Sequence, residues 1–150
     1  MRRFLAYICR RNFHLMAKKK DNKEQQAIEP VTICDQFTEV VAKCDHLNSL
    51  ILIDNFVDDR VLSLFTKRAD GVSATIHTRY SEQFLTDLKK HNEQYPEIQF
   101  IQLPHRNHDR FLIIDDKVHL LGASLKDMGA GLCAITEMNA TPETILELLK

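Results

Sequence analysis

Residues 49–78, SLILIDNFVDDRVLSLFTKRADGVSATIHT, contain the pattern that decides the fold. Residues 49–57 are a short and almost continuous apolar run, which is typical of a strand buried on both faces. Residues 58–71 open with two aspartates and carry apolar side chains at helical spacing, so they predict a short helix that ends near a glycine. Residues 72–78 alternate and are rich in β-branched side chains, which predicts a second strand.

The rest of the chain continues this strand and helix order. We predict helices over 31–46, 81–91 and 142–149, and further strands over 98–103, 110–114, 118–121 and 132–138. The turn 115–117 joins two of these strands as a hairpin. Strand–helix–strand units followed by a hairpin predict an α/β fold, in which helices flank a mixed β-sheet.

The charge of the chain is unevenly distributed. Residues 1–23 hold eight Lys or Arg and one Asp, whereas the chain as a whole has a formal net charge of −1. Such a basic arm can contact nucleic acid or another anionic surface, or it can be a solvated extension, and both interpretations stay open. We therefore predict a basic N-terminal extension or linker over 1–29 and one folded domain over 30–150.

Two further features bound the function. The apolar run near the start is too short for a signal peptide or a membrane span, so we expect a cytoplasmic protein without a membrane partner. The four cysteines lack the spacing of a zinc site, and we expect no metal and no cofactor.

The residues that suggest chemistry lie in 105–127, HRNHDRFLIIDDKVHLLGASLKD. His108 and Arg110 are two positions apart, and in a strand such positions point to the same face. An imidazole can attack phosphorus or transfer a proton, and a guanidinium binds two phosphate oxygens at once. Asp115 follows in the turn, where its carboxylate is expected to reach neighbouring backbone groups or polar side chains.

Three other residues are candidates for the same site. Gly122 permits close approach of a backbone, and amides near it, together with the Ser124 hydroxyl, are possible donors to a developing negative charge. Asp54 lies at the end of a buried strand, the edge at which α/β sheets place their sites. It either faces a ligand or binds a loop amide, and the sequence leaves both interpretations open.

The spacing H-x-R-x4-D-x6-G, formed by His108, Arg110, Asp115 and Gly122, resembles the phospholipase D signature H-x-K-x4-D-x6-G-S-x-N. Residues 52–78 resemble the first strand–helix–strand unit of bacterial single-motif members, and the resemblance covers about residues 31–150. It implies a metal-independent phosphodiesterase in which His108 forms a phosphohistidine, Arg110 holds the phosphate and Asp115 orients. A single motif implies a homodimer, in which the partner's His108 is the general acid.

The chain also departs from that signature. Arg110 replaces the lysine, Ala123-Ser124 stands near the serine, and the asparagine is missing, with Lys126 as a candidate replacement donor. The leading hypothesis is a phosphodiesterase that acts on nucleic acid rather than lipid. The alternative is a catalytically degenerate module that binds phosphate or nucleic acid in a regulatory role. In a third interpretation, an unrelated α/β domain carries the motif by accident.

Overall fold

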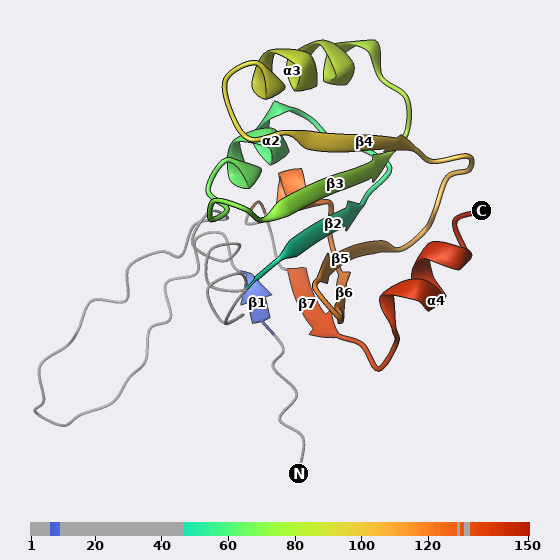
Figure 1. Ribbon diagram of the computed structural model, residues 1–150. Coiled ribbons are helices and arrows are strands. Elements are labelled where there is room, and N and C mark those ends of the chain that lie inside the picture. The colour runs from blue at the N-terminus through green and yellow to red at the C-terminus, as the bar shows by residue number, and fades with distance from the viewer. Residues whose placement is uncertain (1–6, 10–46, 129, 131–132) are drawn as a thin grey trace, which may run out of the picture.

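The computed structural model describes residues 7–9, 47–128, 130 and 133–150, which form one mixed sheet with helices on both faces (Figure 1). The strand order is β1-β7-β6-β5-β2-β3-β4. The strands are β1 (Tyr7–Cys9), β2 (Ser49–Ile53), β3 (Ser73–Thr78), β4 (Ile98–Gln102), β5 (Arg110–Ile114), β6 (Lys117–Leu121) and β7 (Cys133–Glu137). The helices are α2 (Asp59–Phe65), α3 (Glu82–Asn92), the short 3-10 helix η1 (Leu125–Asp127) and α4 (Pro142–Glu147).

The sheet has a parallel half and an antiparallel half. β2, β3 and β4 run parallel to one another, and α2 and α3 make the two crossovers. β5 pairs antiparallel with β2, and β6, β7 and β1 continue in alternating directions. The prediction of an α/β fold with a mixed, helix-flanked sheet is therefore confirmed.

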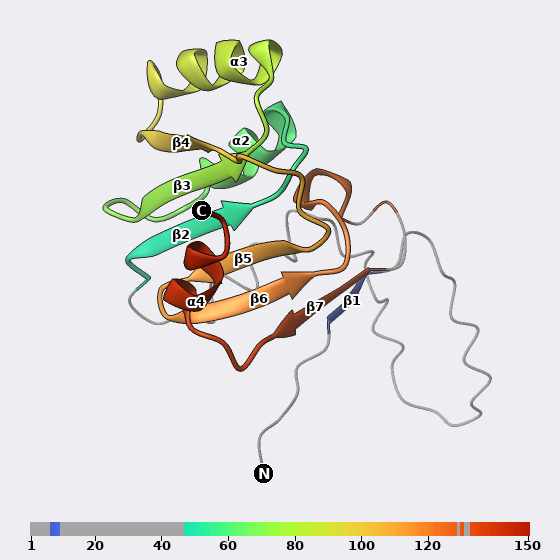
Figure 2. The same cartoon turned by 90° about the vertical axis from the view of Figure 1, so that its right-hand side faces the viewer.

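The alternation along β2 explains why both faces of the sheet are covered. Leu50 and Leu52 point to the face of α2 and α3 and are fully buried there. Ile53, one residue further, belongs to a smaller apolar cluster together with Ile145 of α4. Figure 2 shows the same division, with α4 on one side of the sheet and α2 on the other.

The helix starts follow the capping residues. Asp58, Ser81 and Thr141 are the N-caps of α2, α3 and α4, and each side chain accepts a hydrogen bond from an amide of the first turn. Because each cap satisfies a backbone donor that the helix leaves unpaired, the predicted starts of these three helices are confirmed.

The end of α2 differs from the prediction. The helix stops at Phe65 rather than near Gly71, and buried Arg68 occupies the turn that follows. Its guanidinium donates to the carbonyl oxygens of Phe65 and Val72 and to two carbonyls before β4. These bonds connect the end of α2 to the start of β4. The carbonyls of Phe65 and Val72 are thus bonded to the Arg68 side chain, and the helix does not continue to Gly71.

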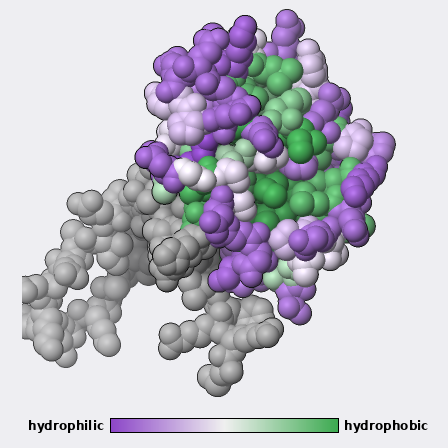
Figure 3. Space-filling view, viewed as in Figure 1, coloured by the Kyte–Doolittle hydropathy of each residue, from purple (hydrophilic) through white to green (hydrophobic). Residues whose placement is uncertain are grey.

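The α4 face of the sheet is only partly covered by the described residues. Figure 3 views this face and shows apolar residues in its middle, bordered by hydrophilic ones. Ile101 of β4 is about half exposed there. Within the described part of the chain, no helix has the length and apolar character that a membrane span requires.

Two sequence predictions concern residues of which little or nothing is described. The helix predicted over 31–46 lies outside the described residues. Of the extension predicted over 1–29, only β1 is described, and it pairs with β7 at the edge of the sheet.

Candidate functional site

The candidate site lies where β2 ends and β5 begins. Asp54 directly follows β2, and Arg110 is the first residue of β5. Because these strands are antiparallel, with Ile53 opposite Phe111, the end of one adjoins the start of the other. Ser124, in the loop between β6 and η1, reaches the same place. We refer to Asp54, Arg110 and Ser124 as the Asp54 cluster.

The Asp54 carboxylate is the centre of this cluster and is almost completely buried. Its Oδ2 accepts hydrogen bonds from the Ser124 hydroxyl at 2.6 Å and from the Leu125 amide at 3.1 Å. Its Oδ1 accepts one from the Phe56 amide at 3.2 Å. The sequence left open whether Asp54 faces a ligand or binds a loop amide. The observed hydrogen bonds favour the second interpretation, because the carboxylate accepts from the amides of Phe56 and Leu125.

Arg110 faces the other side of the same carboxylate. Its Nε is buried and lies 3.5 Å from Asp54 Oδ1, close enough for an ion pair but outside hydrogen-bond geometry. The side chain is 28% exposed. Among the described residues, the two outer guanidinium nitrogens have no hydrogen-bond partner, and they are not among the fully buried atoms. The Nε side of the Arg110 guanidinium is thus held by Asp54, whereas its two outer nitrogens are accessible to a ligand.

A second contact fixes the loop that leads into β5. The Asn107 amide donates to Asn55 Oδ1 at 2.9 Å, and the Asn55 side chain donates back to the Asn107 carbonyl. Asn55 is buried and directly follows Asp54. The loops that follow β2 and precede β5 are therefore connected by a reciprocal pair of hydrogen bonds. This pair could not be predicted from the sequence, since an Asn-to-backbone contact across 52 residues leaves no local pattern.

His108 lies in a bend before β5 and is exposed. Strand pairing begins at Arg110, so the alternation argument for a shared face does not extend to His108. Within the described residues, no hydrogen bond or ion pair holds the imidazole. It is close to the Asp54 cluster in sequence, and its ring is available to solvent.

Asp115 does not join the cluster. It follows β5 at the opposite end of the strand from Arg110, and its Oδ1 accepts from the amides of Asn48 and Ser49 at 2.9 and 2.8 Å. Its φ of 52° places it in the left-handed region of a two-residue turn. The carboxylate thus reaches neighbouring backbone, as expected for this turn position, and it fixes the start of β2. Among the described residues it has no contact with Arg110 or His108, so its orienting role remains only what the resemblance implies.

The groups expected to donate to a ligand are used within the fold. The Gly122 amide donates to the Ala134 carbonyl at 2.8 Å, so the backbone that approaches this glycine is that of β7. The Ser124 hydroxyl is bonded to Asp54. Lys126 Nζ pairs with Asp127 at 2.7 Å, although this pair is near the surface. Of the residues predicted from the sequence, Arg110 and His108 keep groups that are free to bind a ligand.

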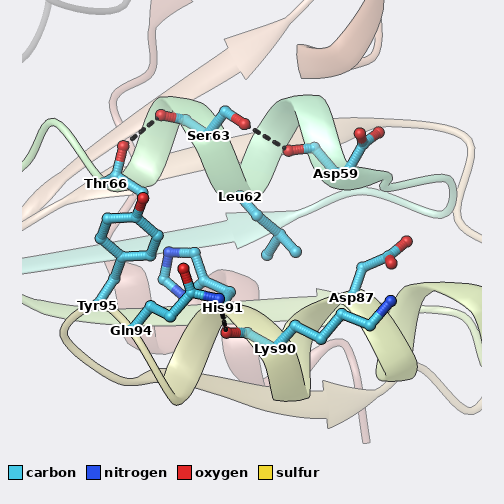
Figure 4. A pocket seen from close by; sticks show the side chains of 9 residues that line it. All are labelled: Asp59, Leu62, Ser63, Thr66, Asp87, Lys90, His91, Gln94 and Tyr95. Atoms are coloured by element: carbon cyan, nitrogen blue, oxygen red, sulfur yellow. Dashed lines mark hydrogen bonds between the residues drawn. The ribbon is translucent and has the colours of Figure 1, made fainter.

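A separate recess lies between α2 and α3, with a volume of about 300 Å³ (Figure 4). His91 lies at one end of it beside Tyr95, and Asp59 and Asp87 lie at the other end. Asn92 Oδ1 accepts from the Ile98 amide, so the His91 Nδ1 that lies 3.0 Å from the same oxygen carries the proton. The other ring nitrogen, Nε2, is an acceptor without a partner among the described residues and has no exposed surface. A ligand in the recess therefore cannot reach it without moving a neighbour.

The comparisons with known proteins give no family for this chain: no protein-family model matches it, and neither does any curated protein. The resemblance to phospholipase D therefore depends on the motif residues and their spacing.

Proposed function

We propose that this chain is a phospholipase D-like module that binds the phosphate of a phosphodiester, in nucleic acid rather than lipid, with Arg110 as the anchor. The observation that supports the proposal is the two-sided environment of Arg110. Its Nε lies 3.5 Å from buried Asp54, whereas its outer nitrogens have no partner among the described residues. A guanidinium held in one orientation binds two phosphate oxygens at a lower entropic cost than a freely rotating one.

The carboxylate of Asp54 does not cancel the charge of Arg110. Ser124, Leu125 and Phe56 each donate a hydrogen bond to it, which spreads its negative charge over three donors. The distance of 3.5 Å to Arg110 Nε also leaves this ion pair weaker than a direct hydrogen-bonded one. The outer face of the guanidinium therefore remains attractive to an anion.

We favour binding over catalysis because groups that catalysis would require already make hydrogen bonds within the fold. Chemistry at phosphorus requires donors for the charge that develops in the transition state. The expected donors were amides near Gly122 and the Ser124 hydroxyl, and of these the Gly122 amide and the Ser124 hydroxyl are bonded within the fold. Asp115, the expected orienting residue, lies at the other end of β5.

Hydrolysis through a phosphohistidine is the second candidate function. His108 is exposed, unpaired among the described residues and two positions before Arg110, so that its imidazole is free to act as a nucleophile. This function requires a homodimer that supplies a second histidine as the general acid. Analytical ultracentrifugation of the intact chain tests that requirement, and a monomer at assay concentrations contradicts it.

The binding proposal is tested by fluorescence anisotropy with a labelled oligonucleotide. We expect Arg110→Ala to weaken binding roughly tenfold or more, Arg110→Lys to weaken it less, and added salt to weaken binding to the wild-type chain. Lys89→Ala is the matched control, since it removes one exposed positive charge from the last turn of α3. Equal losses for Arg110→Ala and Lys89→Ala would show that Arg110 is not the anchor.

Hydrolysis is tested with bis(p-nitrophenyl) phosphate in the presence of EDTA. The second candidate predicts turnover that EDTA leaves intact and His108→Ala abolishes, together with an acid-labile phosphoryl group on the wild-type chain. Binding without turnover identifies a non-catalytic module, and turnover that survives in His108→Ala excludes His108 as the nucleophile.

A further inference from the structure

Phe56 is an exposed aromatic residue held rigidly beside the Asp54 cluster. Its ring is about half exposed, which is unusual for a large apolar side chain beside a buried ion pair. Its backbone is contacted on both sides, because the amide donates to Asp54 Oδ1 at 3.2 Å and the carbonyl lies 3.1 Å from the Ser124 hydroxyl, which shares its single proton between this carbonyl and Asp54 Oδ2. The ring is therefore presented to solvent by a backbone that has little freedom to move.

One arginine lies over this ring, and a second lies close to the backbone that carries it. The Arg106 guanidinium carbon is 5.8 Å from the ring centre, within the range of a cation–π contact. Arg110 Nε and the Phe56 amide both approach the same oxygen, Asp54 Oδ1. The Asn55–Asn107 pair connects the loops that carry Phe56 and Arg106. One exposed aromatic ring and two guanidinium groups are thus held together on a preformed surface.

We propose that this surface binds single-stranded nucleic acid, with one base stacked on Phe56 and neighbouring phosphates bound by Arg106 and Arg110. This inference depends on the proposed function of Arg110. A single strand offers an accessible π-face and a phosphate at every nucleotide, and proteins bind it through aromatic rings interleaved with cations. In a duplex the faces of the bases are covered by their neighbours, and a phospholipid headgroup offers no ring to stack.

The test compares a labelled oligothymidylate with an abasic oligomer of the same length, which carries the same phosphates but has no bases. In the intact wild-type chain, we expect the oligothymidylate to bind roughly tenfold more tightly than the abasic strand. We expect Phe56→Ala to remove that difference by weakening only the oligothymidylate complex, and Phe56→Tyr to retain it. A duplex of the same length carries twice the phosphates but no accessible base faces, so we expect Phe56→Ala to leave its affinity unchanged.

Tyr95→Ala is the matched control, because Tyr95 is as exposed as Phe56 but precedes β4 at the opposite edge of the parallel strands. We expect Tyr95→Ala to leave the affinities for the oligothymidylate and for the abasic strand unchanged. Equal binding of the two wild-type complexes, equal weakening of both by Phe56→Ala, or a duplex complex that Phe56→Ala weakens as much as the oligothymidylate complex would each overturn base stacking. In those cases a loss of both complexes in Arg110→Ala would still support phosphate binding, whereas an Arg110→Ala variant that binds both strands normally would overturn the proposed function itself.

Discussion

Asp54 Oδ1 lies 3.5 Å from Arg110 Nε, and the same carboxylate accepts a 2.6 Å hydrogen bond from Ser124 through its other oxygen. One buried charge thus connects the end of β2, the start of β5 and the loop before η1. Because the first two of these segments carry Phe56 and Arg110 and the third holds the carboxylate in place, Asp54 determines the shape of the proposed binding surface without needing to contact the ligand.

Asp54→Asn is expected to destabilise the fold by ~2–4 kcal/mol. In either orientation the NH2 group of asparagine would face another donor: the Leu125 amide if it replaces Oδ2, or the Phe56 amide and Arg110 Nε if it replaces Oδ1. Arg110 Nε would also remain buried without a counter-charge. Urea unfolding followed by circular dichroism measures the loss. An unchanged free energy of unfolding would mean that the cluster contributes nothing to stability.

A double-mutant cycle with Ser124→Ala tests whether the cluster acts as a unit. We expect a coupling energy of ~1 kcal/mol or more between Asp54→Asn and Ser124→Ala, because the two side chains share a short buried hydrogen bond. Thr141→Ala is the control, since it removes the N-cap of α4 on the other face of the sheet and should be additive with Asp54→Asn.

The sequence predicted the fold well because the information is local. The continuous apolar run of β2, the alternation of β3 and the capping residues Ser81 and Thr141 each determine structure within a few positions. The end of α2 was predicted too late, because Arg68 ends that region through carbonyls 28 and 29 residues away, which no periodicity reports.

The site was predicted only in part for the same reason. Arg110, Asp54 and Ser124 were all identified as candidates, but the hydrogen bond between Asp54 and Ser124 joins positions 70 residues apart and leaves no local pattern. The motif spacing placed Asp115 beside Arg110 in sequence, but an intervening extended strand separates the two ends by roughly 3.4 Å per residue. The aromatic contribution of Phe56 became visible only when the loop around it was placed against Arg106.

Asp115 is expected to matter for stability and not for ligand binding. Asp115→Ala removes acceptors of two backbone amides and puts alanine at a φ of 52°, so we expect a loss of ~2–3 kcal/mol in urea unfolding. Asp115→Asn keeps an oxygen acceptor and tolerates the left-handed region, which limits the loss to ~1 kcal/mol. If Asp115→Asn instead weakened oligonucleotide binding at unchanged stability, Asp115 would belong to the ligand site.

Gly122 is expected to be intolerant of a side chain for steric reasons. A Cβ at this position would lie 3.1 Å from both the backbone nitrogen and oxygen of Ala134, and backbone atoms of a paired strand cannot easily move. We expect Gly122→Ala to lose ~1–3 kcal/mol in urea unfolding. Gly71→Asn is the comparison, since the space around Gly71 is open and asparagine tolerates its positive φ, so the loss should be ~0.5 kcal/mol or less. Equal losses at the two glycines would contradict the steric explanation.

The fold should lose stability as the pH falls below about 6.5. Burial lowers the pKa of His77, and burial also lowers the pKa of His119 despite the opposing hydrogen bond to the Leu112 carbonyl and the nearby charge of Glu137. The folded chain therefore binds protons at these imidazoles more weakly than the unfolded chain, so this contribution is complete above the unfolded pKa and decreases as the pH drops below it. Both rings are only half-buried, so we expect each to lower the free energy of unfolding by ~0.5 kcal/mol between pH 7.5 and 5.5 after screening by solvent.

The measurement is the urea midpoint at both pH values for the wild-type chain and for the double variant His77→Gln/His119→Gln, in which the decrease should be smaller. A decrease of the same size in the double variant would assign the acid sensitivity to other groups.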